Sequence, residues 1–220
     1  MKDPILALDG ALGEFSLAVS VGGAERHLAR GLDGAAALEG GLAAIEAILA
    51  QAGIGLRELG GLAVGTGPGR FTGLRIAISF AKALAVGAGL PLAGVSSFDV
   101  VEEGAAPNAG ARVPRLTIVE GRPGIISARR VDRAGSTFRS GRVREVLDAL
   151  AAPETAITVV GATEDVRAAL GERGASVSFV SGRPELAAVA LLRIARRRPP
   201  AELHALRPDY GEAPAVRIRP

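Results

Sequence analysis

The sequence predicts an α/β fold built from two lobes with the same order of elements. In each half, three strand patterns are followed by alternating helical and strand patterns, giving βββαβαβα. Three antiparallel strands followed by βα units form a mixed five-stranded sheet with helices on both faces. Residues 103–111 have the Gly, Pro and Asn content of a linker. We therefore expect a first lobe over residues 1–105 and a second, basic lobe over residues 106–220.

The first half contains five strand patterns and three helical ones. Strands are expected at 5–9, 15–21, 24–30, 62–65 and 91–95. Leu38, Leu42, Ile45 and Leu49 recur at helical spacing, which predicts a helix over 34–53 that Gly53 ends. A long apolar run predicts a helix over 73–88, and Ser96 or Ser97 is placed to cap a short third helix.

The second half repeats this order. Strands are expected at 113–119, 125–131, 137–143, 157–160 and 177–180. Helices are expected over 143–151 and 163–171, and a last helix runs from Pro184, in its first turn, to Arg198. Two such halves in tandem resemble the actin, sugar-kinase and Hsp70 superfamily, a duplicated RNase H-like fold.

The composition excludes several kinds of site. The chain has 220 residues and no cysteine, so disulfides, thiolate metal sites and a cysteine nucleophile are excluded. His27 and His204 are the two histidines and there is no H-E-x-x-H pattern, so no metal site is expected. Residues 1–4 lead directly into a strand, and no apolar stretch of about 18 residues lacks charges. We expect a cytoplasmic protein without a signal peptide or membrane span.

Charge is unevenly distributed between the halves. Residues 1–105 carry 7 basic and 11 acidic residues, whereas residues 106–220 carry 19 basic and 12 acidic ones. A basic half can meet nucleic acid or an acidic partner, or it can be a solvated surface. Arg193, Arg196, Arg197 and Arg198 cluster at the end of the last expected helix, where cations also complement the helix dipole. We expect that this cluster is not sufficient for specific RNA binding.

The central stretch, residues 61–88, reads as a strand, a glycine-rich turn and a helix. Thr72 occupies the position expected for the N-cap. Such a turn directs backbone N–H groups and the positive end of a helix dipole at one point, where an anion can bind. The loop ends in Arg70-Phe71-Thr72 and fits neither a Walker loop nor the dinucleotide fingerprint. Gly67 and Gly69 are therefore weak candidates for an anion site, and a tight packing turn is the alternative.

The helix that follows has two distinct faces. Arg75, Ser79 and Lys82 form a thin polar stripe, and Ile76, Phe80 and Leu84 fill much of the rest. A small-residue stripe consists of Ala77, Ala81, Ala85 and Ala88. A stripe of alanines lets another helix approach closely, either within the same chain or at a subunit contact.

Residues 64–76, VGTGPGRFTGLRI, resemble the signature G-x-G-P-G-S-F-T-G-[LV]-R-[IV] of the TsaB family. Residues 87–97, GAGLPLAGVSS, continue the likeness, and Pro208 and Tyr210 fit a pattern near the family's C-terminus. Arg70 stands where the family usually has serine. These are bacterial proteins of tRNA threonylcarbamoyladenosine biosynthesis and non-catalytic paralogues of the catalytic subunit TsaD.

The resemblance implies a partner subunit with no catalytic residue and no metal site of its own. It implies pairing through the first lobe with a TsaD-like subunit, a TsaE-like ATPase as third member, a homodimer when isolated, and only indirect contact with tRNA. ATP and Mg²⁺ are expected only within the complex. The expected interface residues are Thr72, Arg75, Ala77, Phe80, Ala81, Lys82 and Leu84.

Asp9 is the third weak candidate for a cofactor site. In kinases of this superfamily, an aspartate at the end of the first strand serves Mg²⁺, and TsaB sequences typically continue with hydroxyl residues. This chain reads Asp9-Gly10-Ala11-Leu12, so the acid is kept and the hydroxyls are lost. A carboxylate without supporting donors is a poor site for Mg²⁺ and phosphate, and a structural role for Asp9 in the turn is the alternative.

Two other functions compete with a partner subunit. An ATP-dependent phosphotransferase of the same superfamily needs a phosphate hairpin with hydroxyls, which residues 10–12 do not supply. A metallopeptidase, an activity once attached to relatives of this fold, needs metal ligands that two separated histidines do not provide.

Overall fold

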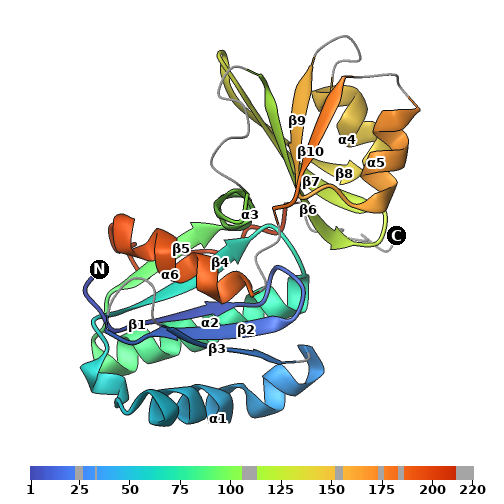
Figure 1. Ribbon diagram of the computed structural model, residues 1–220. Helices are drawn as coiled ribbons and strands as arrows, with labels where there is room; N and C mark the ends of the chain where they lie inside the picture. Colours follow the sequence, from blue (N-terminus) through green and yellow to red (C-terminus); the bar gives the residue numbers. More distant parts are fainter. Residues whose placement is uncertain are drawn as a thin grey trace, which may run out of the picture.

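The computed structural model describes residues 1–22, 27–32, 34–105, 113–151, 156–172, 176–182 and 186–211. The described chain forms two lobes, each built on a mixed five-stranded sheet (Figure 1). The strand orders are β3-β2-β1-β4-β5 and β10-β9-β6-β7-β8, so the second sheet repeats the plan of the first. The predicted duplicated RNase H-like fold is confirmed.

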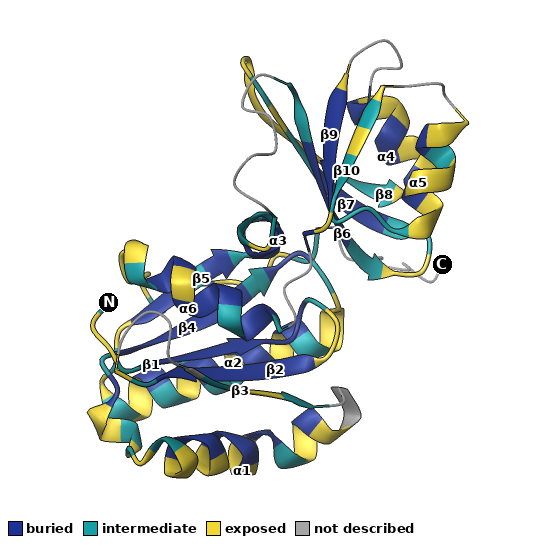
Figure 2. Ribbon diagram, in the orientation of Figure 1, coloured by how far each residue is buried: buried dark blue, intermediate teal, exposed yellow. Residues whose placement is uncertain are grey.

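The first sheet contains β1 (Ile5–Asp9), β2 (Phe15–Ser20), β3 (His27–Leu32), β4 (Gly61–Gly67) and β5 (Leu92–Ser96). Strand β1 pairs antiparallel with β2 and parallel with β4, which makes it central, and all of its residues are buried. The helices α1 (Gly34–Ala52) and α2 (Phe71–Ala88) pack together on one face of this sheet (Figure 2). A short 3₁₀ turn, η1 (Leu56–Glu58), precedes β4.

The second sheet contains β6 (Arg115–Arg122), β7 (Ile125–Asp132), β8 (Gly135–Arg142), β9 (Ile157–Val160) and β10 (Val177–Val180). The helices α4 (Val143–Leu150) and α5 (Glu164–Gly171) cover one of its faces and bury Val146, Leu147 and Leu170. The other face contacts α3 (Ser97–Glu103), the helix that comes directly after β5 in the chain. Ser96 caps α3 by accepting a hydrogen bond from the Phe98 N–H at 3.3 Å, as one of the two predicted alternatives required.

The last helix, α6 (Ala187–Arg197), corrects the predicted lobe division. We expected it to complete the second lobe, but it packs against β1, β2 and β4 of the first sheet. Its Leu191 lies in one buried cluster with Ile5 and Ala63, and the Ala188 N–H donates to Ser16 Oγ at 3.2 Å. The periodicity of a helix shows which of its faces is apolar but not which sheet that face covers. The described residues 186–206 therefore belong to the first lobe.

Two predicted helix starts also differ from the structure. Helix α2 begins at Phe71 with Arg70 as N-cap, and no side chain caps it, so the prediction of Thr72 as N-cap is wrong. The Arg70 N–H donates to the Ala11 carbonyl at 3.0 Å, so a contact with a distant loop fixes the start of the helix. Helix α6 begins at Ala187, while the predicted start at Pro184 and most of the linker 103–111 lie outside the described residues.

By length and composition alone, α2 would be able to cross a membrane. It contains Arg75 and Lys82, and it packs against β1, β4 and α1 with six buried side chains. Helix α2 is therefore a core helix of the first lobe.

The junction between the lobes is partly ionic. Arg129 on β7 donates to Asp99 and Glu102 on α3, at 2.7 and 2.9 Å. Thr117 Oγ1 on β6 donates to the same Glu102 carboxylate at 2.6 Å. The Arg129 guanidinium also lies 5.1 Å from the centre of the Phe98 ring, so α3 is held to the second sheet by charge and by aromatic contact.

Candidate functional site

The glycine-rich loop between β4 and α2 lies at the carboxyl end of β4, beside the loop that follows β1 (Figure 1). In sheets with parallel strands, ligands commonly bind at this edge. Here the loop after β1 packs directly on the glycine-rich loop at Gly69 and on the first turn of α2: a methyl group added at Gly10 would overlap the Gly73 backbone, and one added at Gly73 would overlap Gly10. The glycines allow backbone to approach backbone, and the gap between these loops is closed.

The two weak glycine candidates have the same role. Gly67 has a φ of +96°, and its α-carbon faces the Asp209 carbonyl, while the Asp209 N–H donates to the Thr66 carbonyl at 2.7 Å. Gly69 faces the Ala11 backbone. Both positions are therefore covered by the chain itself, which supports the alternative of a packing turn over the anion site.

Asp9 is fully buried at the end of β1. Its Oδ1 accepts from the N–H groups of Ala11 and Leu12, at 3.1 and 2.9 Å. Its Oδ2 has no hydrogen-bond partner among the described residues and lies against Gly65. Burial raises the pKa of the carboxyl to about 6, although both backbone hydrogen bonds act to lower it. One oxygen caps the turn and the other is enclosed, so the geometry is that of a structural residue.

Replacing Asp9 by Asn should remove a pH dependence of stability. Because the folded pKa is raised, the folded state binds the extra proton, and stability falls as the pH rises from about 4 through about 6. Above pH 6, Asp9→Asn should be more stable than wild type, by up to about 3 kcal/mol for a shift of about two units. Urea unfolding at pH 4.5 and pH 8 measures this difference.

The control for that experiment is Asp132→Asn. The pKa of Asp132 is lowered by its hydrogen bond to Arg130, so its carboxylate contributes stability at neutral pH, and the substitution should gain nothing at pH 8. If the free energy of unfolding changed with pH in the same way for wild type and Asp9→Asn, Asp9 would not be a buried carboxylate without a compensating partner.

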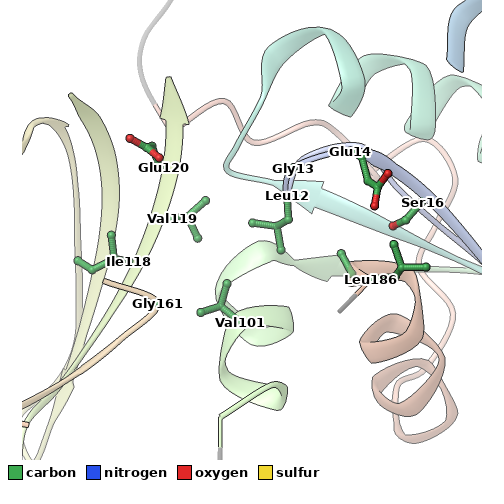
Figure 3. A pocket seen from close by; sticks show the side chains of 11 residues that line it. Leu12, Gly13, Glu14, Ser16, Val101, Ile118, Val119, Glu120, Gly161 and Leu186 are labelled. Carbon is green, nitrogen blue, oxygen red and sulfur yellow. The ribbon is translucent and has the colours of Figure 1, made fainter. Parts of the chain in front are cut away.

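A cavity of about 210 Å³ lies between the lobes (Figure 3). Leu12, Val101 and Val119 come from the first hairpin, α3 and β6, and form its apolar lining. The charged residues that line it in the described chain are Glu14 and Glu120. An adjoining cavity of about 330 Å³ shares Glu120 and adds Glu164 and Arg167, whose guanidinium lies over the Phe179 ring.

The superfamily resemblance implies ATP and Mg²⁺ in such a cleft, but the residues present do not fit them. Polyphosphate needs basic side chains or free N–H groups, whereas this lining carries more carboxylates than cations. The loop that would hold phosphate is closed by the glycine-rich loop, and Asp9 is enclosed. In the described part of the chain, no group of three or more His, Cys, Asp or Glu could hold a metal ion.

The predicted interface residues divide into three groups on α2. Ala77 and Ala81 are fully buried in the first-lobe core, so their prediction as interface residues is wrong: this stripe packs within the chain. Phe80, Lys82 and Leu84 are half-buried at the flanks of the helix. The Phe80 ring meets Phe15 edge-on at 6.3 Å. Thr72 and Arg75 are exposed.

A second small-residue stripe faces outward on α2. Arg75, Ser79 and Ala83 are exposed at intervals of four residues, and Gly87 continues the series. Phe71 and Val86 lie on this side near the two ends of the helix, with 54% and 71% of their surface exposed. The sequence placed Arg75 and Ser79 on a thin polar stripe and favoured the alanine stripe as the close-approach face; only the packing shows that the alanine stripe is the covered one.

Helix α1 extends the apolar surface. Leu38 and Leu42 share the helical spacing of Ile45 and Leu49, but they are 66% and 53% exposed, whereas Ile45 and Leu49 are buried. Since α1 and α2 contact each other on one face of the sheet, two neighbouring helices carry the large exposed apolar residues of the first lobe (Figure 2). Large apolar side chains exposed on neighbouring helices make this side of the first lobe a candidate for a protein–protein contact.

Replacing Ala81 by Leu should destabilise the fold, whereas Ala83→Leu should not. The Ala81 side chain has no exposed surface, so extra methyl groups would overpack the core and cost about 1–3 kcal/mol. Ala83 is exposed, and a change there should stay within about 0.5 kcal/mol. Thermal unfolding of the two variants beside wild type measures both effects, and equal melting of the two variants would contradict this assignment of faces.

Comparison with known proteins places these features in a family. A family model described as "TsaD: tRNA N6-adenosine threonylcarbamoyltransferase" matches residues 39–181, more than half of the chain. The chain belongs to the TsaD family. The match covers most of α1, all of α2, the glycine-rich loop, and the strands and helices of the second lobe from β6 to β10.

Within the TsaD family the chain is most usefully compared with TsaB proteins. It is 46% identical over 61 residues to the "tRNA threonylcarbamoyladenosine biosynthesis protein TsaB" of Escherichia coli, which covers 28% of this chain and 26% of that protein. The matched region thus spans about a quarter of the length of this curated relative. The resemblance to TsaB found in residues 64–97 is confirmed.

Two solved structures show the same fold. The structure titled "YeaZ from Pseudomonas aeruginosa" superposes with a TM-score of 0.68 at 20% identity, covering 95% of this chain and all of that one. A protein "with actin-like ATPase fold and unknown function" from Bacteroides thetaiotaomicron has a TM-score of 0.50 at 10% identity, covering 87% of this chain and 96% of that one. At these identities the likeness concerns the fold alone.

Proposed function

We propose that this chain is a non-catalytic partner subunit in tRNA threonylcarbamoyladenosine biosynthesis. In this proposal it supports a TsaD-like subunit that transfers threonylcarbamoyl to the adenosine beside the anticodon of ANN-decoding tRNAs. The observation that carries the proposal is the exposed face of α2, with Phe71 and Val86 near its ends, together with a glycine-rich loop that is closed by backbone packing. The printed names of its TsaB and TsaD relatives support the pathway.

The outward face of α2 is the proposed docking surface. Its centre consists of Ser79, Ala83 and Gly87, which let another helix approach closely, and Arg75 adds a charge that a partner carboxylate can meet. Of the interface residues that the sequence suggested, Thr72 and Arg75 remain in this proposal, with Phe80 and Leu84 at its edge. The partner is a TsaD-like subunit in the complex and a second copy of the chain in isolation.

The remaining parts of the proposal follow from the same resemblance. A TsaE-like ATPase completes the complex, tRNA is contacted mainly through the other subunits, and the protein acts in the cytoplasm. Three arginines of the basic cluster support the indirect role in tRNA binding, because they pair within the chain. Arg196 binds Asp3, Arg197 binds Glu103 and Arg198 binds Asp99.

An ATP-dependent phosphotransferase is the alternative, and the cleft argues against it. Glu14 and Glu120 would oppose a polyphosphate, and Ala11 and Leu12 use their N–H groups to bind Asp9. We expect no ATP turnover by the isolated protein. A rate of about 1 s⁻¹, which is low but ordinary for an enzyme, would reverse this conclusion once contaminating ATPases are excluded by an equally purified Asp9→Asn variant.

Replacing Ala83 by Arg should prevent association while the fold survives. The side chain is exposed at the centre of the proposed docking face, so a long cation would separate the two helices without disturbing the core. Sedimentation velocity of the isolated protein, and titration of a TsaD-like subunit from the same organism, should both show a loss of binding of at least about tenfold, or 1.4 kcal/mol. Unchanged thermal melting serves as the control.

The matched control substitution for Ala83→Arg is Ala50→Arg. Ala50 is exposed on α1 towards the C-terminal end of that helix, away from Leu38 and Leu42 in sequence, and it adds the same charge to the first lobe. It should leave association unchanged. If both variants associate like wild type, the docking face lies elsewhere on the molecule.

A further inference from the structure

The chain segment after α6 returns across the first lobe and ends between the two lobes. The Ala201 N–H donates to the Leu92 carbonyl at 2.8 Å, and Leu206 is buried in the first-lobe core. The Asp209 N–H then donates to the Thr66 carbonyl at 2.7 Å, beside the glycine-rich loop. Asp209 Oδ1 accepts from the Gly211 N–H at 2.8 Å, which fixes the turn at the end of the described segment.

Three consecutive residues, Asp209, Tyr210 and Gly211, contact three separate parts of the molecule. Asp209 lies against Gly67 of the glycine-rich loop. The Tyr210 ring stacks on Phe71 at the start of α2, with 4.7 Å between ring centres and 32° between ring planes.

Gly211 is the residue that reaches the second lobe. A Cβ atom at this position would lie 2.5 Å from Ser127 Oγ on β7, 2.8 Å from Ser140 Oγ on β8 and 3.1 Å from Pro68 Cβ. The two serine hydroxyls are themselves 2.6 Å apart, so Gly211 sits against a hydrogen-bonded pair that joins β7 to β8.

The aromatic contact belongs to the outward face of α2. Phe71 is half-exposed at the first residue of the helix, and the Arg75 guanidinium lies 5.3 Å from the centre of its ring. Aromatic and arginine side chains of this kind carry a large share of the binding energy at protein interfaces. A partner seated on Arg75 and Phe71 would therefore lie beside the Tyr210 ring.

We propose that Asp209–Gly211 is a strap that couples the docking face of α2 to the position of the second lobe. The strap holds Phe71 through Tyr210 and holds β7 and β8 through Gly211, so ordering one end favours order at the other. By linkage, a partner that stabilises Phe71 also stabilises the lobe arrangement, and a displaced strap weakens partner binding by the same factor. This inference rests on the docking role proposed for α2.

The strap is separate from the ionic junction at α3. Arg129, Asp99 and Glu102 join the lobes through other residues, and none of them contacts the strap in the interactions described above. Substitutions in the strap therefore leave that junction in place, and the lobes remain attached while the coupling is tested.

The first experiment measures hydrogen exchange in the full-length protein. Tyr210→Ala removes the ring stack, and Gly211→Ala places a methyl group against the Ser127 and Ser140 hydroxyls at a φ of +71°. The control Gly124→Ala has the same backbone penalty at a φ of +74°, with no atom within 4 Å. We expect exchange of the backbone amides of residues 70–74 and 126–128 to become about two- to tenfold faster in both strap variants, the range of an aromatic pair, and to stay unchanged in the control.

The second experiment measures association of the same variants by sedimentation and by titration of a TsaD-like subunit. Tyr210→Ala and Gly211→Ala should weaken binding by about two- to tenfold, whereas Gly124→Ala should bind like wild type. Unchanged exchange in the strap variants would overturn the inference, and so would faster exchange with unchanged association. If Ala83→Arg prevents association while both strap variants bind normally, the proposed docking face is supported and the proposed coupling through the strap is contradicted. If Ala83→Arg binds normally, docking at α2 fails, and the coupling fails with it.

Discussion

The contact between the loop after β1 and the start of α2 constrains the rest of the first lobe. Gly10 and Gly73 meet backbone to backbone, and the Arg70 N–H is bound by the Ala11 carbonyl. This contact starts α2 at Phe71 and leaves the helix without a side-chain cap. It also fills the space beside the glycine-rich loop, so a loop with the composition of an anion site instead connects β4 to α2 through close backbone packing.

Helix α2 shows how one composition serves two purposes. Its inward stripe must be small because the helix packs close to β1 and β4, and Ala77 and Ala81 are fully buried there. Its outward stripe is also small, at Ser79, Ala83 and Gly87, although no neighbour within the described chain requires it. A long side chain at these exposed positions would cost the fold little. The outward stripe is therefore the more informative of the two about function.

Much of the fold could be predicted because burial leaves a clear periodic pattern. Strands such as β1, β9 and β10 were predicted at their observed bounds, since each is a short apolar run between turn residues. The C-terminal end of α1 was predicted from Gly53, whose φ of +70° is a conformation that favours glycine. The sequence also showed that residues 10–12 lack the hydroxyl groups of a phosphate-binding hairpin.

The rest depended on contacts between residues far apart in the chain. A helical pattern does not specify which sheet α6 covers, nor which of two small-residue stripes on α2 is buried. The spacing of Leu38, Leu42, Ile45 and Leu49 predicted the helix correctly but did not show that Leu38 and Leu42 are exposed while Ile45 and Leu49 are buried. The strap formed by Asp209–Gly211 had only a weak signal, the match of Pro208 and Tyr210 to a family pattern.

The position of α6 also changes the meaning of the uneven charge. By sequence halves, the first lobe is acidic and the second is strongly basic, which suggested a nucleic-acid surface. Residues 186–211 carry five arginines and two acidic residues, and they pack with the first lobe, which brings that lobe close to neutral. Arg196, Arg197 and Arg198 neutralise Asp3, Glu103 and Asp99 there. Since Asp99 also binds Arg129 of the second lobe, arginines from both lobes share one carboxylate where α3 meets the second sheet.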